Sequence, residues 1–188
     1  MERAGMRDRV DSSVERELMA VARARLGSLW EWEHWRDGKL IDSWSDHNLC
    51  TDQGLNYLLD AGFSAATPIT AWYVAVYDNN HTPAAGNTYA TPGFTEATNY
   101  SGDRKAWQEG GVSAKAITNS ANKASLTFTS AATIYGAALV GGGSAATTKG
   151  DTAGGGKVYN LSAFSSGAKS MASSDVLKVT ITLTAQDV

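Results

Sequence analysis

The chain has 188 residues, a formal net charge of −3 and a single cysteine, Cys50. This length accommodates one sizeable domain with an appendage. The mild charge predicts no nucleic-acid partner and no anionic membrane, and one cysteine excludes an internal disulfide and a cysteine-based metal site. The first residues mix both charge signs without an apolar region, so we expect no signal peptide. No apolar run approaches the length that spans a bilayer.

Residues 8–26 predict an amphipathic helix that ends at Gly27. Apolar side chains recur at three- and four-residue spacing and form one narrow stripe, made of Val10, Val14, Leu18 and Val21. A stripe this narrow cannot form a core of its own. We expect it to lie on a partner surface, with packing on its own domain as the alternative.

A tryptophan-rich β-hairpin is predicted next. Residues 29–35 alternate, Asp37-Gly38 is a strong two-residue turn signal, and residues 39–45 form the return strand. The hairpin carries four tryptophans and a histidine, namely Trp30, Trp32, Trp35, Trp44 and His34. The tryptophans predict core or interface anchors, and a carbohydrate-stacking platform is the lesser alternative.

The rest of the chain is predicted to be mainly strand. Residues 52–60 indicate one short helix, with Thr51 as N-cap and Gly62 as terminator. Strands are predicted over residues 70–77, 105–108, 114–119, 123–129, 133–140, 157–164 and 175–184. A long loop, 78–98, and a glycine-rich loop, 141–156, separate some of them.

This pattern predicts a mainly β fold, an antiparallel β-sandwich or jelly-roll-like domain with an N-terminal helix and one short internal helix. Residues 1–27 form the expected helical arm, and residues 28–188 form the β-sandwich domain. Within that domain, residues 28–66 hold the hairpin and the short helix, and residues 67–188 hold the main strands.

Groups able to perform chemistry are scattered. The histidines at 34, 47 and 81 fall in different predicted elements and lack zinc-site spacing. Segment 150–157 departs from the phosphate-binding loop pattern, because Asp151 and Val158 stand where glycine and Ser or Thr are required. Asp78 and Glu96 offer oxygen ligands without the spacing of a calcium loop. We therefore expect no catalytic residue, no metal, no cofactor and no enzymatic activity.

Several sequence blocks together resemble a group of small virion proteins of tailed bacteriophages. The blocks are residues 48–60 (NLCTDQGLNYLLD), 72–77 (WYVAVY), 82–83 (TP), 89–92 (YATP), 94–96 (FTE), 104–107 (RKAW), 117–121 (ITNSA) and 123–124 (KA). The similarity extends roughly from Trp30 to Val188 and leaves out the N-terminal helix. Tyr77 follows Val76 where the group commonly has Gly-Leu-Phe, which is a minor departure.

The resemblance implies a structural protein of the phage particle and brings no catalytic residue with it. We expect a capsid decoration (cement) protein that binds and stabilises the head shell. Its expected partners are the major capsid protein or other virion proteins, it is expected to form a homo-oligomer, and its location is the virion, assembled in the host cytoplasm. The alternative is a tail fibre or receptor-binding module that contacts host surface glycans.

Two sets of residues are the candidate sites. The candidate interface consists of Val10, Val14, Leu18, Val21, Trp30, Trp32, Trp35 and Trp44. The candidate ligand or partner loop carries Asp78, His81, Tyr89 and Phe94.

Overall fold

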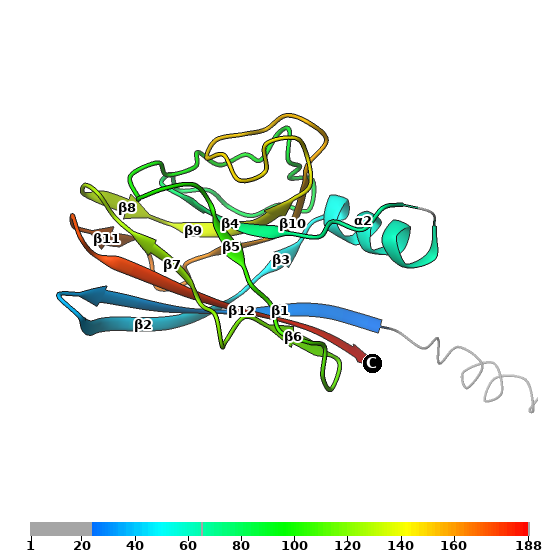
Figure 1. The fold of residues 1–188 in the computed structure, drawn as a ribbon, viewed down its shortest axis with the longest axis horizontal. Coiled ribbons are helices and arrows are strands. Elements are labelled where there is room, and N and C mark those ends of the chain that lie inside the picture. The colour runs from blue at the N-terminus through cyan, green and yellow to red at the C-terminus, as the bar shows by residue number, and fades with distance from the viewer. Residues whose placement is uncertain (1–23, 65, 188) are drawn as a thin grey trace, which may run out of the picture.

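Two antiparallel β-sheets pack face to face in the computed structural model, which describes residues 24–64 and 66–187 (Figure 1). The first sheet has the order β2-β1-β12-β6, with β7 also paired to β12, and the second has the order β3-β10-β9-β4-β5. The strands of the first sheet are β1 (Ala24–Arg36), β2 (Lys39–His47), β6 (Ala116–Thr118), β7 (Ala124–Thr127) and β12 (Val176–Asp187). Those of the second are β3 (Leu49–Cys50), β4 (Trp72–Tyr77), β5 (Lys105–Trp107), β9 (Gly136–Gly141) and β10 (Lys157–Ala163). The predicted β-sandwich is confirmed.

A two-stranded ribbon, β8 (Ala132–Ile134) with β11 (Lys169–Met171), adjoins the sandwich. The sequence predicts one strand over residues 133–140, whereas the chain forms β8 and β9 in different sheets. The change of sheet falls at Tyr135, whose N–H donates to the carbonyl of Tyr77 and whose carbonyl accepts from the N–H of Phe164. Long-range hydrogen bonds at this residue therefore divide the predicted strand.

The pairing of β1 with β12 corrects the predicted boundary of the arm. Residues 8–23 of the predicted helix lie outside the described residues. Residues 24–26 belong to β1, where they pair in antiparallel register with Asp187, Gln186 and Ala185. The local sequence does not predict the pairing of residues 24–26, because their partner strand, β12, is the last one in the chain.

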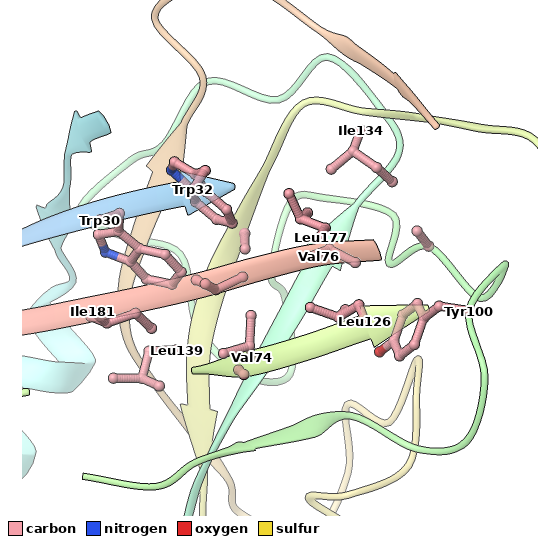
Figure 2. Close-up of a cluster of buried hydrophobic side chains, with 14 of the residues drawn as sticks. Trp30, Trp32, Val74, Val76, Tyr100, Leu126, Ile134, Leu139, Leu177 and Ile181 are labelled. Atoms are coloured by element: carbon pink, nitrogen blue, oxygen red, sulfur yellow. The ribbon is translucent and has the colours of Figure 1, made fainter. Parts of the chain in front are cut away.

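The core between the sheets is built on two tryptophans of β1. Trp30 and Trp32 are 0% and 1% exposed, and their ring centroids lie 5.3 Å apart in a stacked arrangement. Figure 2 shows them beside Ile181 and Leu177 of β12 and opposite Leu139 of β9. Alternation along β1 places every second side chain in this core, as the hairpin pattern predicts.

A second apolar cluster covers the other face of the second sheet. Ala75, Ala138, Val140, Val158 and Leu161 pack there with the buried ring of Tyr89. Tyr89 belongs to the long loop between β4 and β5, and Figure 1 shows this loop and the glycine-rich loop before β10 arched over the sheet. The molecule therefore has a third layer, made of loops.

Helix α2 (Asp52–Phe63) begins at the N-cap Thr51, as predicted, since the Thr51 hydroxyl accepts the Gly54 N–H. A side chain at Gly54 would place its Cβ 2.3 Å from the carbonyl oxygen of Tyr159, so only glycine allows α2 to lie this close to β10. The helix runs through the predicted terminator Gly62 and ends at Phe63. Its last turn extends beyond the sandwich (Figure 1).

Replacing Trp32 by alanine is expected to destabilise the fold by about 3–5 kcal/mol, because it removes a fully buried aromatic side chain and leaves a cavity. Trp35→Ala in the same strand is the matched control, since Trp35 lies half-buried on the other face. Urea unfolding of both variants measures the difference. Equal losses for the two would contradict the assignment of Trp32 to the core.

Candidate functional site

The structure separates the predicted interface residues into three groups. Trp30 and Trp32 lie inside the sandwich, so the prediction that they contact a partner is wrong for these two, and the alternative that they are core residues is confirmed. Trp35 is half-buried on the outer face of the hairpin, whereas Trp44 is half-buried on the core side, where it stacks on Trp32 and packs edge-on against Phe164. The four residues of the arm stripe, Val10, Val14, Leu18 and Val21, lie outside the described residues.

The end of the β1–β2 hairpin exposes apolar side chains. Leu40 and Ile41 are 48% and 49% exposed, and the β1–β2 register is irregular beside them, because Trp35 pairs with Leu40 while His34 pairs with Asp42. The turn between the strands has positive φ at Asp37 (50°) and Gly38 (72°), the backbone of a tight two-residue hairpin. This end of the molecule, which we call the hairpin end, therefore presents Leu40 and Ile41 on a well-defined turn.

Strand β2 is an edge strand. It pairs with β1 on one side, and within residues 24–64 and 66–187 no strand pairs with its other side. Unpaired N–H and C=O groups along such an edge accept a further strand. The hairpin end therefore combines free backbone groups with exposed apolar side chains.

A buried carboxylate fixes the hairpin end to the turn before β12. The Asp175 side chain is fully buried and accepts hydrogen bonds from Arg36 Nε and Nη2, both at 2.7 Å, and from the Ala172 N–H. His34 Nε2 lies 2.7 Å from Asp175 Oδ2. The hydrogen bonds from Arg36 hold the pKa of the Asp175 carboxyl well below its usual range, although burial opposes this. These bonds lock the strand that carries the turn.

A hollow of about 320 Å³ lies beside this network on the outer face of the sheet. It is lined by Trp35, Asp37, Gly38, Ser174, Val176 and Lys178. The ammonium of Lys178 sits 4.3 Å from the Trp35 ring centroid, and the indole N–H of Trp35 donates to Glu33. Trp35 is therefore held by its own neighbours while keeping part of its ring on the surface.

The candidate partner loop forms a second hollow, of about 280 Å³, in the loop layer. Tyr89 and Phe94 line it, together with Glu96, Arg104 and Asp151. His81 lies nearby rather than in the lining. Its ring packs against Tyr77 and Phe94, and its Nε2 lies 3.1 Å from Asn87 Oδ1. Asp78 contributes its backbone N–H to Thr95, while its side chain is exposed.

Arg104 is buried within the loop layer, and all of its N–H donors are hydrogen-bonded. Its five N–H groups bond the Glu96 carboxylate, the Tyr89 hydroxyl and the carbonyls of Ala146 and Asp151. The Arg104 and Glu96 side chains are each 3% exposed. Burial alone would lower the pKa of Arg104, but the bonds and charge of Glu96 outweigh burial and raise it. Arg104 has no donor left for an anionic ligand.

The oxygen atoms around Arg104 are committed as well. The Tyr89 hydroxyl donates to Asp151 at 2.8 Å, and Glu96 also accepts the Gly150 N–H. Burial raises the pKa of Tyr89, so this phenol keeps its proton. The arrangement therefore holds two loops together and offers little free polar capacity for ligand recognition.

Sequence reasoning missed this ion pair and considered Glu96 only as a weak cation ligand. The sequence signal that could have revealed the Glu96–Arg104 pair is the position of these two residues in the chain. Glu96 and Arg104 are charged residues eight positions apart inside the FTE and RKAW blocks, in a stretch that also carries Phe94, Ala97 and Tyr100. Charges in such surroundings are buried in pairs when they are buried at all.

Within the described part of the chain, no group of three or more His, Cys, Asp or Glu side chains is placed to hold a metal ion. The same residues include no helix with the length and apolar character needed to cross a membrane. A comparison with protein-family models finds no match, and a search of curated proteins finds no similar sequence.

Replacing Glu96 by glutamine is expected to cost about 3–5 kcal/mol, because it leaves the buried Arg104 guanidinium without its counter-charge. Glu33→Gln is the matched control. Glu33 pairs with Lys123 on the surface, with side chains 26% and 36% exposed, and such pairs contribute about 0–1 kcal/mol. Chemical denaturation of both variants gives the comparison. A loss below 1 kcal/mol at Glu96 would contradict the structural role of the pair.

The Asp175 network predicts a loss of stability in acid. Its carboxyl has a lowered pKa in the folded chain and an ordinary value of about 3.9 when unfolded, so the stabilisation is complete above about pH 5 and declines as the pH falls toward the lowered folded value. Asp175→Asn should therefore destabilise the fold by about 3 kcal/mol at pH 7 and by much less at pH 2.5. Unfolding at both pH values measures this. A gap that stays constant with pH would be inconsistent with it.

Proposed function

We propose that the protein is a structural component of a tailed-phage particle, a capsid decoration protein that attaches to the head shell through its hairpin end. The observation that carries the proposal is the open β2 edge with Leu40 and Ile41 exposed beside it. The resemblance of the sequence blocks to small virion proteins supplies the phage context. The major capsid protein is the proposed partner.

An open edge strand favours attachment by strand addition. In that mode main-chain hydrogen bonds supply affinity and alternate side chains supply specificity. A segment that added to β2 would cover the exposed side chains of Leu40 and Ile41. Exposed apolar side chains beside free backbone groups commonly mark a protein interface.

The hydrogen bonds of Asp175 behind the hairpin end suit this role. Asp175 ties Arg36 and His34 to the turn before β12, so the strand that leads into the turn is ordered before any partner arrives. An element that is already ordered loses little conformational entropy on binding. Trp35, which is half-buried and pairs with Leu40 in the β1–β2 register, adds aromatic surface beside Leu40.

The second candidate function is a tail fibre or receptor-binding module. It is supported by the two hollows lined with aromatic side chains, at Trp35 and at Tyr89. We rank it below decoration, because the charged groups of the Tyr89 hollow are already paired with one another. A glycan site draws its specificity from polar groups that are free to bond the sugar.

The double variant Leu40→Ser/Ile41→Ser is expected to fold normally and to bind particles at least tenfold more weakly. Each lost apolar anchor is expected to cost about 2 kcal/mol, and about 1.4 kcal/mol corresponds to tenfold. Particles that lack the protein are incubated with purified variant or wild type, and the bound fraction is measured after sedimentation.

The control is Val112→Ser, which removes a side chain that is 74% exposed outside the hairpin end. It should bind like wild type. If the double variant keeps its melting temperature and also binds like wild type, attachment through the hairpin end is wrong. If the wild type itself binds no particle, the decoration role is wrong.

A further inference from the structure

Helix α2 has an apolar stripe that residues 24–64 and 66–187 leave mostly exposed. Leu55, Leu59 and Phe63 are spaced four residues apart and so share one face of the helix. Leu59 is 60% exposed and Phe63 is 90% exposed. We call these three residues the α2 stripe.

The opposite face of α2 is the one that packs. Gly54 is buried against β10, Leu58 contacts the core, and the Tyr57 ring lies 5.4 Å from the ring of Trp72. The Tyr57 hydroxyl also accepts the Ile69 N–H at 2.6 Å. These contacts anchor the helix without using the α2 stripe, so the stripe is not needed for docking α2 to the sandwich.

We propose that the α2 stripe binds the N-terminal segment of the same chain, through Val10, Val14, Leu18 and Val21. The sequence predicts a helix over this segment with a single narrow apolar stripe, which has the same geometry as the α2 stripe. Two amphipathic helices with one unpaired stripe each bury both by packing together. The proposal is independent of the virion role.

The place where the segment joins the domain favours this occupant. Strand β1 begins at Ala24, and Figure 1 shows the start of β1 at the same end of the molecule as α2. Leu26, near that start, is 38% exposed and by alternation shares a face with Ser28 and Trp30, the face turned toward the second sheet. A chain that returns from Ala24 toward α2 would first pass the exposed side chain of Leu26.

The length of the N-terminal segment and its covalent attachment to the domain also favour binding to the α2 stripe. Residues 8–22 would form a helix of about 22 Å, which is longer than the roughly 12 Å between Leu55 and Phe63 along α2. A short tether gives the segment an effective concentration in the millimolar range at its own domain. A second copy of the chain at micromolar concentration competes poorly against that.

Limited trypsin digestion of the full chain tests the proposal. Arg16 lies within the predicted helix, and proteases cleave such a segment only when it opens. Wild type should be cut slowly at Arg16, and Leu59→Ser/Phe63→Ser should be cut at least tenfold faster with an unchanged melting temperature. Val14→Ser/Leu18→Ser should behave like the α2 variant, while Val112→Ser, an exposed apolar site elsewhere, should behave like wild type.

Dilution distinguishes the proposed occupant from a second copy. Docking within one chain predicts cleavage rates at Arg16 that do not change between 1 and 100 µM protein. Protection that disappears on dilution would overturn the proposal in favour of contacts between copies. Equally fast cleavage of wild type and the α2 variant would overturn the proposal outright, because the α2 stripe would then give Arg16 no protection from trypsin.

Discussion

The antiparallel pairing of β1 with β12 is the constraint on which the rest of the structure depends. It joins the beginning and the end of the described chain, and it sets the register that turns Trp30 and Trp32 into the core. The same register extends β1 to the turn at Asp37 and brings Arg36 within reach of Asp175. It also places the start of β1 at the end opposite to that turn, so the hairpin end and helix α2 occupy opposite ends of the molecule (Figure 1).

Two of the ion-pair networks are built on buried charges and stabilise the fold in the same way. Asp175 and Arg104 are each buried charges with several hydrogen-bond partners, and each joins segments that are distant in the sequence. Removing one partner from such a network leaves a charge without compensation, which costs far more than the pair contributes by itself. The loops of the third layer are therefore fixed by Arg104, while apolar burial and main-chain pairing hold the two sheets.

Local signals in the sequence predict the sandwich, the Asp37-Gly38 turn, the Thr51 cap and the shared face of Trp30 and Trp32, because each depends on alternation or on turn and cap chemistry. What they miss depends on contacts between distant residues. The start of β1 follows from its pairing with the last strand, and the division at Tyr135 follows from hydrogen bonds to Tyr77 and Phe164. Strands β3 and β11 are too short to show a pattern. The partners of Arg104 come from several loops, and no spacing in the sequence brings them together.

Reconstruction of whole particles by electron microscopy tests the central claim most directly, since it shows both where the protein lies and which end faces its partner. Decoration predicts density for the sandwich repeated over the head shell, with the turn at Asp37-Gly38 and the edge of β2 against the shell and α2 directed away. Density confined to the tail, or a shell contact made by α2 with the hairpin end free, would contradict the account.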